Sequence, residues 1–253
     1  AAEYKNLFWG PGHIIQFANT LSMMVAWFIL AEFVLKKSFN EGVVKKLLTI
    51  YLLFSIAQPL IYLTPVQNQA RLFTLGMGFG IGIPSFFIAL IVLKAVLESA
   101  ELRGFSKLPW RDPAFSSLAL SLALFGAGGL IGATDPTGNT SVPAHYHASL
   151  GAVTIAFMGL TYYFLPEVNR HVHSERVAGW QPYLYGVGLL MLILGLFWAG
   201  LRNAPRKAYA MSYGDPAAVA MNLMGVGAVI AVVGGAAFVA NALLPLLRKP
   251  QNS

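Results

Sequence analysis

Residues 181–201 read QPYLYGVGLLMLILGLFWAGL, a run of 21 residues without a charged side chain. An α-helix of about 20 apolar residues crosses the roughly 30 Å hydrocarbon core of a bilayer. The rest of the 253-residue chain has the same character, with 57% hydrophobic residues, 11% charged residues and a mean hydropathy of +0.63. Soluble domains carry about 25% charged residues. The composition therefore excludes an ordinary soluble domain and predicts an integral membrane protein.

Six further stretches on either side of this run are long and apolar enough to span a bilayer. The seven predicted spans are about residues 12–35, 44–63, 71–97, 114–133, 144–166, 181–201 and 217–247. The chain contains no cysteine, which excludes disulfides, thiolate metal sites and iron–sulfur clusters. We expect a single all-α membrane domain over residues 1–253.

The net charge of +7 is unevenly distributed over the two sides of the predicted spans. Twelve of the 17 basic residues fall on one side, which the positive-inside rule assigns to the cytoplasm. They are Lys36, Lys37, Lys45, Lys46, Lys94, Arg103, Lys107, Arg111, Arg170, Arg176, Arg248 and Lys249. We therefore expect a protein of the inner (cytoplasmic) membrane with its N-terminus outside and its C-terminus in the cytoplasm. The basic charge indicates membrane-facing loops, and no nucleic-acid partner is expected.

Three of the five histidines fall at the outer ends of predicted spans. His13 opens the first span, and His145 and His147 open the fifth. Ionisable residues within membranes are costly and usually functional. Residues two apart on a helix point about 200° apart, which does not suit one shared metal but suits two planar cofactors on opposite sides. Haem fits this description, because imidazole is its usual axial ligand.

Two features bear on this interpretation. Small neighbours of the HxH pair would let a macrocycle approach the backbone; they are Ala144, Ala148, Gly151 and Ala152. The competing interpretation is that the three histidines are interfacial residues hydrogen-bonded to carbonyl groups. His171 and His173 lie in the polar segment NRHVHSER, where a solvated loop is the expected setting.

Four segments, in order, resemble the catalytic subunit of the haem–copper oxidases, the family of cytochrome oxidases and nitric oxide reductases. The resemblance rests on WGPGH (9–13), RLFTLGMGFGIGIPS (71–85), NTSVPAHYHASLGAVTIAFMGLTYYFLP (139–166) and APRKAYAMSYGDP (204–216). The H-[FY]-H segment is the most specific of these, and the others gain weight from their order. The resemblance implies that the seven spans correspond to helices six to twelve of that twelve-helix subunit.

The resemblance also implies residue roles. His145 would ligate the active-site haem, His147 would ligate a low-spin haem on the opposite side, and His13 would stand at the first copper-ligand position. Arg206 and Lys207 match the family's Pro-Arg-Arg loop and would pair with haem propionates. We expect one or two haems, of b type.

The sequence departs from the family at its copper site. Counting back from Arg71 without gaps places the family's His-His copper pair on Pro59 and Leu60, neither of which binds copper. The cross-linked tyrosine of the oxidases falls on Phe17, and a proton-channel lysine falls on Ile88. One imidazole alone is a poor copper site, and carboxamides such as Gln16 and Gln58 are weak ligands. We therefore expect the copper site to be lost.

Three functions remain open. The first is a haem-binding subunit of a respiratory complex that relays electrons between quinone or a membrane haem and an outward-facing redox protein such as a cytochrome c. The second is a divergent split oxidase or nitric oxide reductase that reduces O₂ or NO, if His13 leaves the iron open. The third is a membrane anchor without cofactors. Expected partners are membrane lipid and another membrane subunit that supplies the equivalent of helices one to five.

Overall fold

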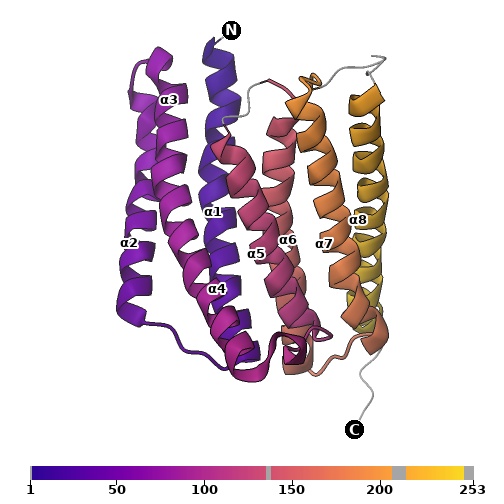
Figure 1. Ribbon diagram of the computed structural model, residues 1–253. Helices are drawn as coiled ribbons and strands as arrows, with labels where there is room; N and C mark the ends of the chain where they lie inside the picture. Colours follow the sequence, from indigo (N-terminus) through magenta and orange to yellow (C-terminus); the bar gives the residue numbers. More distant parts are fainter. Residues whose placement is uncertain (1, 135–137, 207–214, 248–253) are drawn as a thin grey trace. The chain divides into compact units, whose positions relative to one another are not determined.

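The computed structural model describes the chain except for residues 1, 135–137, 207–214 and 248–253, and several side chains near these gaps are also not described (Figure 1). The long helices are α1 (Ala2–Leu35), α2 (Glu41–Ala57), α3 (Val66–Met77), α4 (Ile83–Arg103), α5 (Pro113–Ala133), α6 (Ser141–Glu167), α7 (Glu175–Leu201) and α8 (Asp215–Leu247). Short helical segments η1 (Gln58–Leu63), η2 (Gly78–Gly82) and η3 (Phe105–Lys107) connect or extend them.

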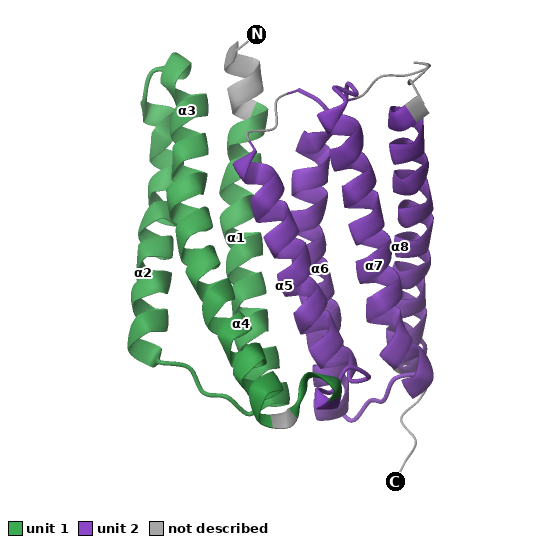
Figure 2. Ribbon diagram, in the orientation of Figure 1, with its two compact units in different colours: residues 1–106 green, residues 107–253 purple. Residues whose placement is uncertain are grey.

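Seven helical segments within the described residues are long and apolar enough to cross a membrane. The segments α2–η1 and α3–η2–α4 each count as one of them. This confirms the predicted all-α fold of seven membrane-spanning helices. Several helices extend beyond the apolar stretches: α1 begins at Ala2, and α7 begins at Glu175 rather than at residue 181. The chain divides into two compact units, residues 1–106 and 107–253 (Figure 2).

Unit 1 contains α1 to α4, with α1 packed against α3 and α4. Its core is apolar and fully buried, and includes Met24, Trp27 and Leu30 of α1 and Ile88 and Val92 of α4. The Tyr51 hydroxyl donates a hydrogen bond to the carbonyl of Phe17, which ties α2 to α1. A buried hydroxyl needs such a partner in an apolar interior. Ile88, where the resemblance predicted the loss of a proton-channel lysine, is part of this apolar core.

A π-helical turn, η2, joins α3 to α4 within one long membrane-spanning segment. Its glycines differ in their surroundings. A Cβ at Gly80 would come within 3.0 Å of the Phe17 ring and closer still to Phe54, whereas Gly78 has open space around it. The glycine-rich stretch therefore serves close packing at some positions and a change of helical geometry overall. Turns of this kind are rare, and the apolar pattern did not predict one.

Unit 2 contains α5 to α8, packed in sequence with the closest contact between α7 and α8. Four glycines make this contact possible: Gly188 and Gly195 on α7, and Gly227 and Gly234 on α8. A Cβ at Gly195 would lie 2.5 Å from the Ala220 carbonyl oxygen and the Met224 nitrogen. Small residues let membrane helices approach backbone to backbone, which supplies the dispersion contacts that hold them together in lipid.

A buried polar cluster joins three helices of unit 2. The Tyr162 hydroxyl donates to Gln181 Oε1 at 3.0 Å, and Gln181 Nε2 donates to the Gly234 carbonyl at 3.1 Å. Asn241 of α8 exchanges hydrogen bonds with the backbone of Ser174, the N-cap of α7. Each polar group is thus satisfied, as an apolar environment requires. The cluster fixes α6, α7 and α8 at the end of the unit opposite the start of α6.

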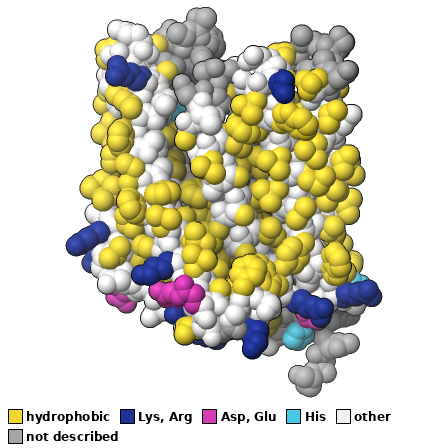
Figure 3. Space-filling model, viewed as in Figure 1, with side chains coloured by type: hydrophobic (Ala, Val, Ile, Leu, Met, Phe, Trp, Pro, Cys, Tyr) yellow, Lys and Arg dark blue, Asp and Glu magenta, His cyan; other side chains and the backbone are white. Residues whose placement is uncertain are grey.

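Charged side chains lie at the ends of the helices. Figure 3 shows hydrophobic side chains over the middle of the visible face, with Lys, Arg, Asp and Glu near its margins. In unit 1, Lys37 pairs with Glu98 at 3.1 Å, which links the segment after α1 to α4. In unit 2, Arg170 donates to the Pro245 carbonyl in the last turn of α8. This distribution is that of an integral membrane protein.

Candidate functional site

His145 lies one turn into α6 and points towards α5. Its Nδ1 is 2.7 Å from the carbonyl oxygen of Gly128 on α5. Gly132, one turn further along α5, leaves the space that the ring occupies, because a Cβ there would lie 2.8 Å from His145 Cε1 and Nδ1. The ring is half-buried. Two glycines spaced i, i+4 on α5 therefore receive and orient this imidazole.

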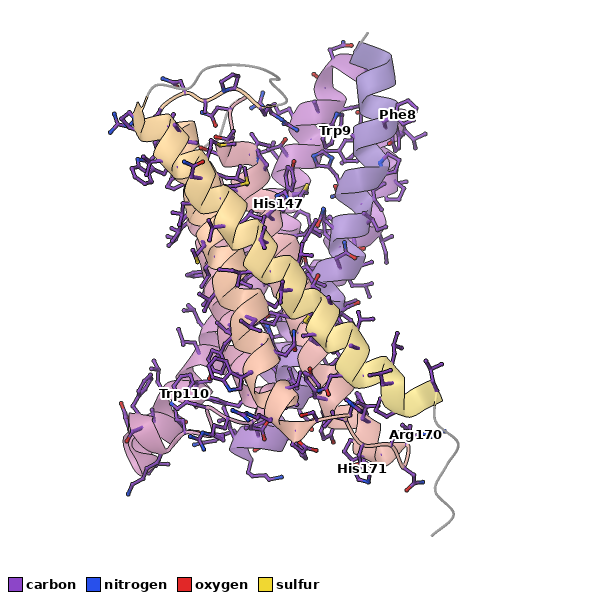
Figure 4. The ribbon with its side chains drawn as sticks, turned by 90° about the vertical axis from the view of Figure 1, so that its right-hand side faces the viewer. Phe8, Trp9, Trp110, His147, Arg170 and His171 are labelled. Carbon is purple, nitrogen blue, oxygen red and sulfur yellow. The ribbon has the colours of Figure 1, made fainter. Side chains whose placement is uncertain are left out.

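His147 is also half-buried but takes its hydrogen-bond partner from its own helix. Its Nδ1 is 2.7 Å from the Pro143 carbonyl oxygen, four residues earlier. Its ring stacks on Tyr146 with the centroids 5.1 Å apart. Figure 4 shows His147 in the upper half of unit 2, far along the helices from Trp110 and Arg170. Because α6 is α-helical at both histidines, their Cα–Cβ directions differ by about 200°.

His13 lies in the N-terminal part of α1, in unit 1. Its Nδ1 is 2.5 Å from the Trp9 carbonyl oxygen, four residues earlier. Its ring contacts Phe73 of α3, with the centroids 5.6 Å apart, and Phe73 in turn meets Tyr62 edge to face. Phe8 and Trp9 are exposed close by on the same helix (Figure 4). His13 is therefore held at the edge of an aromatic cluster.

The three histidines share one hydrogen-bonding pattern. A carbonyl oxygen only accepts, so each Nδ1 carries a proton, and in the neutral ring Nε2 then has the free lone pair. None of the three Nε2 atoms is hydrogen-bonded to a residue that the structure describes. Metal-ligating histidines usually donate their second N–H to a carbonyl or a carboxylate, which fixes the tautomer and the ring orientation. The carbonyl partners that the interfacial interpretation expected are present, but they use only one nitrogen of each ring.

The end of unit 1 near η1 holds a different buried polar group. Gln58 is 1% exposed; its Nε2 donates to the Phe54 carbonyl at 3.2 Å, and its Oε1 has no partner among the described residues. The amide occupies the space beside Gly76, where a Cβ would lie 2.8 Å from Oε1. Pro59 and Leu60, the positions reached by counting back from Arg71, are both exposed. Gln58 is thus the residue of this stretch that faces the interior.

The start of α6 is attached to the end of α7 and to the segment that follows it. Asn139 Nδ2 donates to the Gly200 carbonyl at 3.1 Å, and Thr140 Oγ1 donates to the Leu196 carbonyl at 2.8 Å. A short antiparallel bridge pairs Asn139 with Pro205, the residue before Arg206. The structure therefore brings the half-buried Arg206 to the end of unit 2 that carries His145 and His147. Lys207 lies outside the described residues.

The small residues beside the HxH pair serve helix packing, whereas the sequence predicted that they leave room for a macrocycle. Ala144, Ala148 and Ala152 are fully buried. A Cβ at Gly128 would lie 3.2 Å from Ala148 Cβ, and one at Gly151 would collide with Leu189 of α7. These residues therefore pack α6 against its helical neighbours. The room expected for a macrocycle at these positions is occupied by protein.

Two observations limit what kind of metal centre the described residues can form alone. No three His, Cys, Asp or Glu side chains among them come together as a metal-ion site. A haem iron needs only one or two protein ligands, and single imidazoles are sufficient for that. His13 belongs to unit 1, whereas His145, His147 and Arg206 belong to unit 2. These residues are thus better suited to bind haem iron as single ligands than to form a multi-residue site for a metal ion.

Comparison with known proteins identifies the family. Residues 1–237 match the family Cytochrome C and Quinol oxidase polypeptide I, and the chain belongs to it. It is 29% identical over 241 residues to cytochrome c oxidase subunit 1 of Thermus thermophilus, which covers 83% of this chain and 42% of that protein. It is also 29% identical over 183 residues to an uncharacterised protein of Aquifex aeolicus, covering 72% of this chain and 42% of the other.

A solved structure has the same fold. It is described as a heme-copper terminal oxidase dimer, and it matches with a TM-score of 0.78 and 22% identity over 98% of this chain and 50% of that chain. At this identity the match concerns the fold. The chain therefore spans half or less of the length of these relatives, and its seven helices are a part of the twelve-helix subunit I arrangement.

Proposed function

We propose that the chain is a haem-binding part of an electron-transfer complex of the haem–copper oxidase type. Family membership supports the class of complex. The observation that carries the proposal is the shared state of the three imidazoles, each with Nδ1 on a carbonyl and Nε2 without a hydrogen-bond partner among the described residues. Haem of b type, one or two per complex, would supply one-electron redox chemistry at these positions. The role of this chain is to relay electrons between quinone or a membrane haem and an outward-facing redox protein, such as a cytochrome c.

His145 and His147 are the proposed axial ligands. The Gly128 carbonyl holds the His145 ring and the Pro143 carbonyl holds the His147 ring, so that each offers Nε2 as a neutral donor. The 200° difference in direction sends them to separate planar groups rather than to one ion. Hydrogen bonds from Nδ1 to carbonyls also fix the tautomer and the orientation of the ligating ring. His13 stands at the family's first copper-ligand position, where we propose that copper is not bound.

Arg206 and Lys207 are the proposed partners of haem propionates. Arginine binds carboxylates with two parallel hydrogen bonds and stays charged at every physiological pH. The Asn139–Pro205 bridge supports this role, since it fixes the residue before Arg206 next to the start of α6. The position of Lys207 is supported only by the match to the family's loop.

The remaining expectations also stay proposals. We propose a single membrane domain with its N-terminus outside and its C-terminus in the cytoplasm, surrounded by lipid and completed by further membrane helices. Those helices correspond to the part of the relatives that the match does not reach, and they belong to another subunit or to the same polypeptide. Those helices would supply whatever further protein ligand a haem held by His147 needs.

A second candidate function is reduction of O₂ or NO at the haem held by His145. The match to oxidase subunits favours it. It requires an open coordination position at the iron, whereas the electron-relay function works with two axial imidazoles. A reduced-minus-CO difference spectrum separates the two, because CO binds only to an open iron.

The proposal is tested by counting haem in the purified complex. A pyridine haemochrome assay on His145→Ala should show the loss of one haem, with His147→Ala losing the other if two are bound. His171→Ala is the matched control, since His171 is exposed in the segment between α6 and α7 (Figure 4). Unchanged haem content in both α6 variants would refute the ligand assignment. Copper in equal amount to the protein would overturn the proposed loss of that metal.

A further inference from the structure

Two carboxamide side chains and a glycine share one face of α1. Gly12, Gln16 and Asn19 point within about 60° of one another around the helix axis, at about 100° per residue. Gln16 and Asn19 are half-buried, and no atom lies within 4 Å of a Cβ built at Gly12. We call these three residues the amide face of α1. His13 flanks this face, because its direction is about 60° from that of Gln16.

The amide face runs from the edge of the hydrocarbon core almost to its middle. The membrane-spanning part of α1 is Phe8–Leu35, and we take its midpoint as the centre of the bilayer. At about 1.5 Å per residue, Gly12 is about 14 Å from this centre and Asn19 is about 4 Å from it. Half of the hydrocarbon core measures about 15 Å. Both amides therefore lie at the depth of the acyl chains.

The carboxamides of Gln16 and Asn19 have no hydrogen-bond partner among the described residues. Buried polar groups of native proteins are otherwise almost always hydrogen-bonded. Fully enclosed side-chain polar atoms without a partner occur at only two of the described residues, Gln58 and Ser117. Because Gln16 and Asn19 are not among these, their polar atoms adjoin space that is large enough for a water molecule.

The chemistry of the amide face favours water over lipid and over a further membrane helix. Acyl chains offer no hydrogen bonds, and an unpaired polar group in hydrocarbon costs free energy. A carboxamide has two N–H donors and two acceptor lone pairs, so the two amides together can form about eight hydrogen bonds. The backbone groups of a neighbouring helix are already paired, so such a helix could contribute only side chains at matching depths. Water supplies donors and acceptors at every depth.

The polar character of this face ends towards the middle of α1. Met23, Ala26 and Leu30 continue in the same direction around the helix axis, and all three are apolar and buried. At the other end, the exposed aromatic residues Phe8 and Trp9 mark the membrane surface (Figure 4). The amide face is therefore open towards one membrane surface and closed near the bilayer centre.

We propose that the amide face is one wall of a water-filled half-channel, which leads from the membrane surface at the N-terminal end of α1 to the middle of the bilayer. Gln16 and Asn19 bind the water through their side-chain amides. Neither side chain ionises, so the wall holds water in the membrane without placing a charge there. The half-channel passes His13 and ends before Met23. The proposal requires that α1 crosses the membrane, and it does not depend on bound haem.

The test measures the access of water to single introduced cysteines, which the cysteine-free chain allows. The full complex in nanodiscs, with both membrane surfaces open to the reagent, is treated with a positively charged methanethiosulfonate. Only an ionised thiol attacks this reagent, and burial in apolar surroundings suppresses that ionisation. Intact-mass analysis of the chain should show rapid modification of Gln16→Cys and Asn19→Cys.

Ile15→Cys and Ala18→Cys are the matched controls. Each position is exposed, precedes a test position by one residue and differs from it in depth by only about 1.5 Å. Their directions differ from those of the test positions by about 100°, so they lie off the amide face. We expect both to react at least about 10-fold more slowly, because a thiol in apolar surroundings stays protonated.

A second change tests the path itself. Gly12→Leu, added to Asn19→Cys, places a longer side chain in the open space near the membrane surface and should slow the modification. Gly78→Leu, added in the same way, is its control, because Gly78 also has open space around it but lies in η2. It should leave the rate unchanged.

Three results would overturn the proposal. Slow modification at both amide positions would show that lipid or another helix covers this face. Equally fast modification at the two control positions would show general access of water to α1 rather than a half-channel. An unchanged rate after Gly12→Leu would show that the reagent does not enter along the amide face. The readout does not involve haem, so its outcome is independent of the proposed function.

Discussion

The orientation of three imidazole rings is the residue-scale feature on which the proposed chemistry depends. A free histidine exchanges between two tautomers and many rotamers, whereas each of these rings is fixed by a carbonyl at 2.5–2.7 Å. The protein thus provides oriented Nε2 donors before any cofactor is bound. Such preorganisation is what neighbours of a metal ligand contribute to affinity.

The first prediction concerns Gly132, which leaves room for the His145 ring. Gly132→Ala places a Cβ 2.8 Å from Cε1 and Nδ1 of that ring, so the ring has to turn away from Gly128. We expect the affinity for haem to fall by roughly 10- to 100-fold, which is the usual effect of changing a residue that orients a metal ligand. The haem content after dialysis and the position of the Soret band measure this.

Gly129→Ala is the control for this variant. It is the same substitution on the same helix, with no atom within 4 Å of the new methyl group. It should keep full haem content and gain helix propensity. Equal haem loss in the two variants would show that α5 as a whole, and not the His145 ring, responds to the change.

The histidines themselves were predictable from the sequence, but most of their partners were not. HxH stands out because ionisable residues are rare in apolar spans. The partners are backbone carbonyls, which every residue has, so only the packing of α5 on α6 selects Gly128. Pro143 and Trp9 could have been found as the residues four positions before a helical histidine. The alanines beside HxH were misjudged, because a small residue serves helix packing and cofactor access equally well.

At the scale of elements, the glycines between α7 and α8 decide how closely two long helices approach. In lipid the hydrophobic effect contributes little to the association of helices. The free energy of association therefore comes from contact area and from the close approach of the two backbones. Gly195→Ala introduces a Cβ 2.5 Å from the backbone of α8. We expect destabilisation of about 1–3 kcal/mol, the usual cost of overpacking. Thermal unfolding in detergent, followed by circular dichroism, measures it.

Gly225→Ala offers the matched comparison within α8. No atom lies within 4 Å of its added methyl group, and alanine favours helix over glycine by about 1 kcal/mol. This variant should unfold at the same temperature as the parent or slightly higher. A parallel loss of stability in both variants would mean that glycine flexibility, rather than close approach, is what α7 and α8 require.

The helices were largely predictable as elements, since long apolar runs have few other structures available in a membrane. Their ends were less predictable. Both α1 and α7 begin before their apolar stretches. At α7 the boundary at Glu175 lies in polar sequence, where capping by Ser174 and not hydropathy sets it. The change from α-helix to the short η1 and to the π-turn η2 leaves no periodic signature in a uniformly apolar stretch.

At the scale of the whole molecule, the apolar surface and the charged ends of the helices define a membrane protein, while its orientation is a prediction. The absence of cysteine from the sequence makes this testable with single introduced thiols. Ala133→Cys, at the end of α5 near His145, should react with a membrane-impermeant maleimide added outside intact cells. Ser106→Cys, between α4 and α5, should react only after lysis.

Both positions are exposed, so a difference in labelling reports on sidedness and not on burial. The expected pattern follows from the larger number of basic residues at the ends of α1, α4 and α6. The opposite pattern would place the histidines of α6 towards the cytoplasm and exclude an outward-facing electron partner.

The π-turn Gly78–Gly82 has a consequence for how members of this family are aligned. One inserted residue in a regular helix would swing everything after it by about 100° around the axis. A single π-turn accommodates the extra residue. The side chains of α3 and α4 therefore keep the directions around the helix axis that they would have in a continuous α-helix one residue shorter. Residue counts that pass through this point, such as the thirteen positions from Arg71 to Pro84, therefore do not convert directly into a rotation.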